Sequence, residues 1–271
     1  MTQHVLFLAY RDWALHAVEA IMEDPSIKPY FDHALISEHD TVLEARELEV
    51  SPLVFALGWS WKIPLPGRHL HRGRITLIAH PSPLPRYRGG SPIQNQILAG
   101  EDVSALTLFE ATEEMDAGPI FWQQGFSLDG TLDDVLDRIQ TLTVDGCIAA
   151  LQAIRARQLV TVPQIAAGET AIRFGLDHWK NWERRTPDMA ELTPEMLAEM
   201  TGRQLHDFIR CQQPPYPQAF VRGNDGEMVL LDTRLVTKED FERHGLTPGA
   251  HTQPSLSSVP WKRSVDAAKA R

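Results

Sequence analysis

The chain has 271 residues, of which 43% are hydrophobic and 23% are charged, and its formal net charge is −10. These shares are ordinary for a globular protein, so they exclude a disordered or fibrous chain. The negative charge disfavours nucleic acid as a ligand, because affinity for nucleic acid comes largely from Lys and Arg contacts with phosphates. At roughly 150 residues per domain, the length predicts one large domain with an appendage.

Nothing in the sequence indicates secretion, a membrane span or a metal site. No run approaches the roughly 20 apolar residues that a span needs, and the first residues lack the basic segment of a signal peptide. The two cysteines, Cys147 and Cys211, lie far apart, unlike the cysteines of a disulfide-bonded secreted domain. No His, Cys or carboxylate residues stand at metal-ligand spacing. We therefore expect a cytoplasmic protein without a metal.

Short apolar runs alternate with helical patterns in the first 163 residues. This alternation predicts an α/β fold with a doubly wound, mostly parallel sheet. We expect strands at residues 5–10, 33–37, 52–59, 75–79, 105–109 and 120–126. We expect helices at residues 13–22, 41–48, 91–98 and 131–156, the third capped by the Ser91 hydroxyl. Arg11-Asp12-Trp13 stands where a glycine-rich phosphate loop would follow the first strand, so a dinucleotide is not the expected cofactor.

The pattern changes after Pro163, so we assign residues 1–163 to a large domain and residues 164–244 to a small C-terminal α+β domain. In the second domain, a helix capped near Thr201 precedes strands at residues 219–222 and 227–236. From about residue 245 the composition turns to Thr, Pro, Ser, Gln and Gly. Such a composition predicts a mobile or loosely docked tail at residues 245–271.

Two polar residues stand where a parallel sheet would present them to a ligand. His80 ends a buried strand, and ligands of open parallel sheets bind at the carboxyl ends of strands. Prolines and glycines make the loop after it rigid and let its backbone approach a ligand closely. Asp116 lies in a turn just ahead of the strand at residues 120–126. Taken singly, each residue is more often structural than catalytic.

The pair gains weight from a motif that extends over about 40 residues. It reads His80-x-Ser82-x-Leu84-Pro85-x-Tyr87-Arg88-Gly89-x-x-Pro92-Ile93, then Gly100-Glu101, Thr107 and Asp116-x-Gly118-x-Ile120. With these residues the chain resembles the 10-formyltetrahydrofolate-dependent formyltransferase family, which includes methionyl-tRNA formyltransferase and the sugar N-formyltransferases. Arg184-Arg185-Thr186-Pro187 and the module after it are similar to the C-terminal part of these enzymes. The resemblance implies a Rossmann-like formyltransferase core with 10-formyltetrahydrofolate as co-substrate.

The resemblance assigns the chemistry to His80 and Asp116 but shows one departure. The family pattern carries an Asn two residues before the histidine, and this chain has Ile78 there. Losing one oxyanion donor typically costs about 3 kcal/mol of transition-state stabilisation. The hydrolase domain of 10-formyltetrahydrofolate dehydrogenase is similar in having Ile-x-His-Pro-Ser, so the departure does not imply an inactive site.

The resemblance also implies the residues that surround the substrates. Contacts with the folate are expected from Trp59, Trp61, Ile63, Pro85, Arg86, Tyr87, Arg88, Gly89 and Met115. Contacts with the acceptor or the reacting group are expected from Tyr10, Arg11, Ile78 and Ser82, and Arg86, Tyr87 and the C-terminal module are expected to contribute to acceptor specificity.

The expected reaction is transfer of the formyl group to an amine, with an amino sugar, often nucleotide-linked, as the preferred acceptor. The chain is acidic and short, which disfavours tRNA as the acceptor. Two alternatives stay open: a 10-formyltetrahydrofolate hydrolase that uses water, which Ile78 favours, and a folate-binding protein without turnover. A homodimer is compatible with the sequence.

Overall fold

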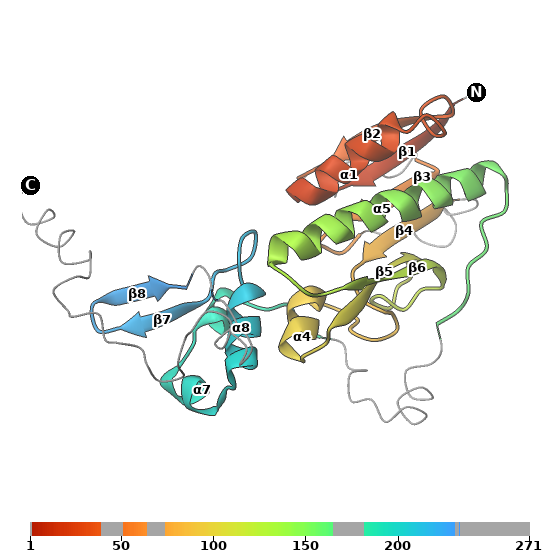
Figure 1. Ribbon diagram of the computed structural model, residues 1–271. Helices are drawn as coiled ribbons and strands as arrows, with labels where there is room; N and C mark the ends of the chain where they lie inside the picture. The colour runs from red at the N-terminus through yellow and green to blue at the C-terminus, as the bar shows by residue number, and fades with distance from the viewer. Residues whose placement is uncertain (1, 39–50, 64–73, 165–181, 231–232, 234–271) are drawn as a thin grey trace, which may run out of the picture. The chain divides into compact units, whose positions relative to one another are not determined.

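The computed structural model describes residues 2–38, 51–63, 74–164, 182–230 and 233 (Figure 1). The chain divides into two compact units, residues 1–232 and 233–271, and the first contains all the helices and strands described. Its centre is a six-stranded sheet with the order β2-β1-β3-β4-β5-β6. The strands are β1 (Gln3–Leu8), β2 (Phe31–Ile36), β3 (Leu53–Leu57), β4 (Ile75–His80), β5 (Val103–Glu110) and β6 (Ile120–Ser127). The helices of this part are α1 (Asp12–Glu23), α4 (Pro92–Leu98) and α5 (Leu132–Arg155).

The sheet confirms the predicted α/β class and its mostly parallel order. Strands β2, β1, β3 and β4 pair in parallel, whereas β5 and β6 form an antiparallel edge. Every predicted strand of the sheet is present with small shifts at its ends, which is the usual uncertainty of strand limits. The chain leaves β1 for β2 on one side and returns to β3 on the other, so the strand order reverses at β1. In open sheets, such a reversal marks the crevice where ligands bind.

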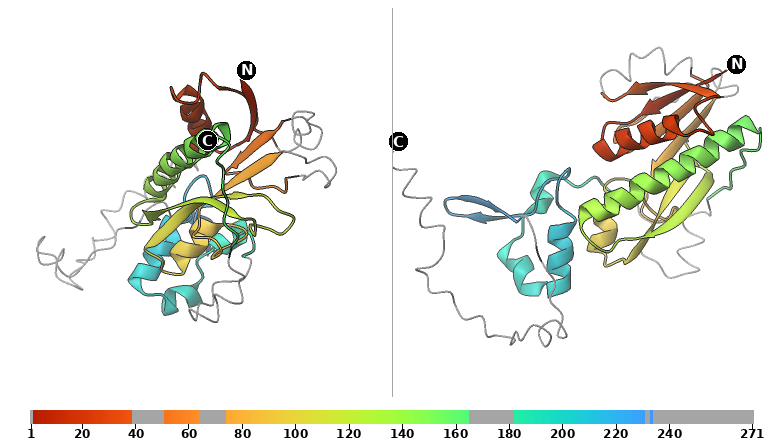
Figure 2. Two further views of the ribbon diagram at one scale, coloured as in Figure 1. Left: turned by 90° about the vertical axis from the view of Figure 1, so that its right-hand side faces the viewer. Right: turned by 45° about the horizontal axis from the view of Figure 1, so that its top comes forward.

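Helices α1 and α5 lie side by side on one face of the sheet (Figure 2). Val5 and Phe7 pack into the core on this face, while Leu6 and Leu8 pack into the core on the opposite face. All four side chains are fully buried. Burial on both faces explains why β1 is a continuous apolar run without alternation. The helix predicted at residues 41–48 lies outside the described residues.

Side-chain caps fix two helices where the sequence predicts them, and a third prediction is wrong. The hydroxyl of Thr131 and the carboxylate of Asp134 form a reciprocal capping box at the start of α5. Thr201 caps α8 (Gly202–Arg210) in the same way with Gln204. Ser91 does not cap α4 with its side chain, because its backbone is left-handed, with φ 50° and ψ 47°, and an N-cap is normally extended. Its Oγ instead accepts a hydrogen bond from the Arg185 backbone N–H at 3.0 Å.

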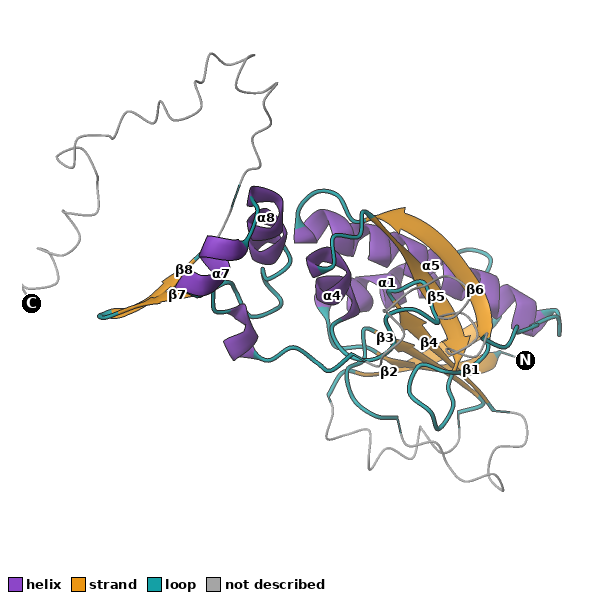
Figure 3. Cartoon of the chain, turned by 90° about the horizontal axis from the view of Figure 1, so that it is seen from below, coloured by secondary structure: helices purple, strands orange, loops and turns teal. Residues whose placement is uncertain are grey.

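The C-terminal module contains a 3₁₀ helix, η1 (Pro187–Ala190), α7 (Pro194–Glu199), α8 and the hairpin of β7 (Phe220–Gly223) and β8 (Gly226–Val229). Figure 3 shows the hairpin next to α7, and a small apolar core centred on Leu192, Phe208, Ile209 and Ala219 joins these elements. The strand predicted at 227–236 ends at Val229, and its last residues, like the predicted tail at 245–271, are mostly outside the described part. The boundaries after residues 163 and 244 stay predictions.

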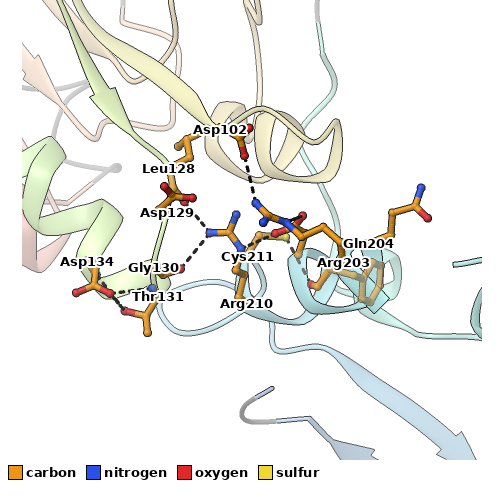
Figure 4. Close-up of polar contacts among 12 residues, drawn as sticks. Asp102, Leu128, Asp129, Gly130, Thr131, Asp134, Arg203, Gln204, Arg210 and Cys211 are labelled. Atoms are coloured by element: carbon orange, nitrogen blue, oxygen red, sulfur yellow. Dashed lines mark hydrogen bonds and ion pairs between the residues drawn. The ribbon is translucent and has the colours of Figure 1, made fainter. Parts of the chain in front are cut away.

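A buried ionic network joins α8 to the segment before α5 (Figure 4). Arg210 donates from Nη1 to the carbonyl oxygens of Leu128 at 2.7 Å and Gly130 at 3.1 Å. Its Nε lies 2.6 Å from Asp207 Oδ1, and Arg203 Nε lies 2.9 Å from Asp207 Oδ2. Asp207 and Arg210 are only 4% and 8% exposed, so each needs the other to compensate its desolvation. Within the described residues, no helix is both long and apolar enough to cross a membrane.

Candidate active site

The first residue of the site, His80, is the buried last residue of β4. Its Nε2 lies 2.9 Å from the carbonyl oxygen of Tyr87. Because a carbonyl oxygen can only accept a hydrogen bond, Nε2 carries a proton and donates it. The other ring nitrogen, Nδ1, lies 3.6 Å from Oδ2 of Asp116, which is an ion-pair distance. Nδ1 therefore faces the carboxylate without a direct hydrogen bond, and a proton on Nδ1 would place a positive charge beside Asp116.

Asp116 is positioned by two close backbone contacts. Its own backbone is left-handed, with φ 51°, which Asp tolerates better than most residues. Oδ2 accepts a hydrogen bond from the Gly89 N–H at 2.8 Å. Two residues further on, a Cβ added to Gly118 would lie 1.7 Å from the carbonyl oxygen of Glu110, so only glycine fits this turn. Oδ1 has no hydrogen-bond partner within the described part of the chain, and it is therefore the oxygen that can receive a proton from a substrate.

Polar side chains of the antiparallel edge hold the loop that follows His80. Thr107 Oγ1 donates to the Ser82 carbonyl oxygen at 2.6 Å. Gln123 Nε2 donates to Thr107 Oγ1 at 2.8 Å and to the Leu84 carbonyl oxygen at 3.1 Å. The loop thus has a fixed shape before any ligand arrives. Sequence reasoning missed Gln123, although a polar residue directly across from Thr107 is a usable signal.

Gln164 is the second residue that sequence reasoning missed. Its Nε2 donates to the carbonyl oxygens of Asp116 at 2.9 Å and Gly118 at 2.8 Å. Its Oε1 accepts from Arg88 Nη2 at 2.7 Å and from Nε at 3.2 Å. One amide therefore ties the Asp116 turn to the loop after His80. The sequence separations of 46 to 76 residues leave no local pattern that could have revealed it.

Trp59 and Trp61, predicted at the folate site, lie against Tyr10, predicted at the acceptor site, where the strand order reverses. The ring of Tyr10 lies 6.0 Å from that of Trp59 and 4.6 Å from that of Trp61, centroid to centroid. Tyr10 Oη is also 2.7 Å from Ser60 Oγ. The indole Nε1 of Trp59 is buried and has no hydrogen-bond partner among the described residues. A buried donor without an acceptor beside flat aromatic rings fits a heteroaromatic ligand that carries an acceptor atom. Ile63 is buried in the neighbouring apolar cluster.

The side chains of Arg86 and Tyr87 point to protein partners. Both contact Glu101: Arg86 Nη2 forms an ion pair with it, and the Tyr87 hydroxyl donates to Oε1 at 2.9 Å. The Tyr87 ring stacks on Trp182 with 5.7 Å between centroids. Burial, followed by the hydrogen bond to Glu101, raises the pKa of the Tyr87 phenol, so it stays a neutral donor. Their predicted ligand contacts stay predictions.

The other predicted folate residues, Pro85, Arg88, Gly89 and Met115, differ in their surroundings. Pro85 follows Leu84 through a cis peptide bond. Arg88 is buried and reaches Glu114 at 3.3 Å besides Gln164. Gly89 has φ 97°, and a Cβ there would lie 2.3 Å from the Trp182 carbonyl oxygen, so a side chain is excluded. Met115 is 60% exposed beside Asp116.

The predicted acceptor residues also differ in what they offer. Ser82 is fully buried, and its hydroxyl donates to the Arg86 carbonyl oxygen at 2.8 Å. Ile78 is half-buried and packs against the apolar cluster around Leu8 and Ala56, so its side chain supplies no hydrogen-bond donor. Arg11 is the predicted acceptor residue that presents a charge. No group of three or more potential metal ligands occurs among the residues described.

The sequence matches a known family over the region that contains the site. Residues 25–151 match the family described as formyl transferase. A methionyl-tRNA formyltransferase of Lactobacillus gasseri is 28% identical over 196 residues, which cover 71% of this chain and 57% of that protein. Two further methionyl-tRNA formyltransferases are matched over 63% and 55% of their length, so the chain spans less than two thirds of each of these relatives.

Solved structures share the fold at lower identity. Methionyl-tRNA formyltransferase from Clostridium thermocellum aligns with a TM-score of 0.70 and 19% identity, over 86% of this chain and 93% of the other. A sugar N-formyltransferase from Shewanella aligns with 0.62 and 17%, over 87% and 99%. HypX from Aquifex aeolicus, in complex with tetrahydrofolic acid, aligns with 0.64 and 21%, over 86% and 38%. The family match over residues 25–151, which include His80 and Asp116, assigns this region to the formyl transferase family.

Proposed function

We propose that this chain is an N-formyltransferase that moves the formyl group of 10-formyltetrahydrofolate to an amine. The observation that carries the proposal is the His80 and Asp116 pair at 3.6 Å, at the carboxyl edge of the sheet. The loop that contacts His80 through Tyr87 also holds Asp116 through Gly89. The family match, and the bound tetrahydrofolate in one solved structure of the same fold, support the co-substrate.

The two residues divide the work of the reaction. The co-substrate supplies the formyl carbon, which the amine nitrogen attacks to form a new C–N bond. Protonated His80 stabilises the negative charge that develops on the formyl oxygen, as a preorganised donor does. Asp116 receives the proton that the amine loses, at the unoccupied Oδ1. The bond between the carbon and the folate N10 then breaks, and N10 takes one proton, so an N-formyl compound and tetrahydrofolate leave.

The acceptor we propose is an amino sugar, with a nucleotide-linked one preferred. The net charge of −10 argues against a large polyanionic partner such as tRNA. The sugar N-formyltransferase from Shewanella shares the fold over 99% of its chain, but a methionyl-tRNA formyltransferase does so over 93%, so the fold does not separate the two acceptors. The matched sequence relatives from Lactobacillus are methionyl-tRNA formyltransferases, so methionyl-tRNA is the competing acceptor.

Water as the nucleophile is the second candidate, and Ile78 is the observation that favours it. Ile78-Ala79-His80-Pro81-Ser82 resembles the Ile-x-His-Pro-Ser sequence of the hydrolase domain of 10-formyltetrahydrofolate dehydrogenase, in which water is the nucleophile. A protein that binds folate without turnover is the remaining alternative. A homodimer and a cytoplasmic location stay predictions.

Tetrahydrofolate release separates these functions. Purified chain is mixed with 10-formyltetrahydrofolate alone, with nucleotide-linked amino sugars, and with methionyl-tRNA. We expect release that depends on an amino sugar and falls by about 10²–10⁴-fold in His80→Ala. His16→Ala, which changes an exposed histidine on α1, is the matched control and should keep full activity. Equal release in buffer would replace transfer by hydrolysis, and folate binding without release under any condition would contradict both enzymatic functions.

A further inference from the structure

Arg11 is a cation held between two aromatic rings without an acid partner. It directly follows β1 and Tyr10, and its backbone caps α1 while its side chain makes no capping hydrogen bond. The guanidinium carbon lies 5.0 Å from the centroid of the Tyr10 ring and 4.8 Å from that of the Tyr216 ring. No carboxylate among the described residues pairs with it, and the neighbouring Asp12 is exposed.

This arrangement leaves the hydrogen-bonding edge of Arg11 available. A guanidinium stacked on aromatic faces is fixed in orientation, and its N–H groups point outward in the plane. That planar fork matches the oxygens of a phosphate or carboxylate. Because Arg11 follows β1, where the strand order reverses, the fork lies at the edge where this fold class binds ligands.

Arg184 adds a second positive charge and connects the cluster to the catalytic loop. Both Arg11 and Arg184 act electrostatically on Tyr216, although burial is the larger effect and raises the pKa of its phenol. A Cβ added to Gly90 would lie 2.4 Å from the Arg184 Cα, so the two backbones touch. Gly90 follows Gly89, whose N–H holds Asp116. The cationic cluster is therefore next to the loop that positions the catalytic carboxylate.

Gln94 supplies an independent sign of a ligand. Its side chain acts on the Tyr216 phenol, whose pKa it lowers against the larger effect of burial, and the residue is only 3% exposed. Its Oε1 is buried and has no partner within the described residues. Buried side-chain oxygens nearly always accept a hydrogen bond, so a donor group of a ligand would complete this one. A hydroxyl or N–H group beside an anion would satisfy it.

We propose that Arg11, assisted by Arg184 and Tyr216, binds a phosphate group of the acceptor. The inference rests on the proposed formyl transfer and narrows its substrate to amines that carry phosphate. Both a sugar nucleotide and an aminoacyl-tRNA have this chemistry, and neutral amines do not. Arg11 sets specificity by holding the phosphate while the amine reaches the formyl carbon near His80.

Binding of phosphate probes tests the site without reference to catalysis. A nucleoside diphosphate and inorganic diphosphate are titrated by calorimetry into the full chain, its Arg11→Met and Arg11→Lys variants, and Arg155→Met. The control removes the same type of contact elsewhere: the Arg155 guanidinium lies 3.9 Å from the Tyr30 ring, just before β2. We expect binding to weaken by roughly tenfold or more in Arg11→Met, less in Arg11→Lys, and not in Arg155→Met. Equal binding by the wild type and Arg11→Met, or no binding by the wild type, would overturn the proposal.

Kinetics then identify the source of the phosphate. Each of two acceptors, a nucleotide-linked amino sugar and methionyl-tRNA, is compared with its counterpart that lacks the phosphate. In Arg11→Met, kcat/KM should fall by roughly tenfold or more for the phosphorylated acceptor and stay within about threefold for the other. An equal loss for both members of a pair would contradict the phosphate role. If no amine is formylated, the proposed transfer is wrong, while an Arg11-dependent loss of diphosphate binding still supports the anion site.

Discussion

Replacing Gln164 with leucine tests whether the site depends on the amide that joins its two halves. The substitution keeps the size of the side chain and removes four hydrogen bonds. Two of these are donated to backbone carbonyls, and each contributes about 1 kcal/mol of net stability. The other two come from the buried Arg88 guanidinium, and hydrogen bonds to a charged group contribute about 1.5–3 kcal/mol. Four separate losses would sum to roughly 5–8 kcal/mol. Because Arg88 keeps Glu114 as a partner, much of its share is retained, and we expect the free energy of unfolding to drop by roughly 3 kcal/mol.

Catalysis should suffer beyond this loss of stability. Without Gln164 the Asp116 turn can shift, and a misplacement of about 1 Å can cost about 10²-fold in rate. We therefore expect kcat of Gln164→Leu to fall about 10²-fold at a temperature where the variant is fully folded, with KM for folate changed little. Thermal unfolding should show Tm lower by roughly 6–12 °C. Gln158→Leu, which changes an exposed glutamine in the segment after α5, is the matched control. A folded Gln164→Leu enzyme with kcat within threefold of the wild type would refute the reasoning.

Three further outcomes follow from single contacts. Arg210→Met leaves the buried Asp207 with Arg203 alone, so the free energy of unfolding measured in urea should fall by roughly 3 kcal/mol. In the control Arg222→Met, which removes an exposed ion pair with Glu227, it should fall by less than about 1 kcal/mol. Hydrogen bonds from Thr131 in the capping box lower the pKa of the Asp134 carboxyl. The ionised carboxylate therefore stabilises the folded state at pH values above an ordinary Asp pKa of about 3.9, and this stabilisation is lost as the pH falls through the lowered pKa. Asp134→Ala should accordingly differ from the wild type in Tm at pH 6 and converge with it as the pH falls below about 4; a constant difference would contradict this. Ile78→Asn restores a side-chain donor two residues before His80, so amine-dependent turnover should rise by about tenfold or more, with Ile78→Val as the control. No gain in a folded Ile78→Asn variant would mean that the formyl oxygen already has its hydrogen-bond donors.

Elements whose structure is set by residues close together in the chain could be predicted from the sequence. The strand at residues 5–10 is recognisable because Val5 to Leu8 are buried on both faces, which leaves a purely apolar run. The caps at Thr131 and Thr201 are recognisable because their partners lie three residues away. The same reasoning fails at Ser91, since contacts with residues 182 to 185 hold this segment in a left-handed conformation.

Contacts between distant segments set most of what the sequence did not reveal. Gln164 and Gln123 act on residues far along the chain, and no periodicity reports such a pairing. The antiparallel edge of β5 and β6 has a similar origin, because an apolar run does not indicate the direction in which it pairs. Glu101 belongs to the family motif, yet only the structure shows that it takes up the side chains of Arg86 and Tyr87.

The loop from Tyr87 to Gly89 makes the two chemical groups of the site interdependent. The Tyr87 carbonyl fixes Nε2 of His80, and the Gly89 N–H fixes Oδ2 of Asp116. A shift of this loop would therefore move His80, the proposed oxyanion donor, and Asp116, the proposed proton acceptor, together. With Ile78 offering no donor, the developing oxyanion depends on His80 more heavily than it would beside an Asn. The residues that hold this loop, Trp182, Gln123 and Gln164, should therefore affect the rate although none of them is proposed to contact the reacting atoms.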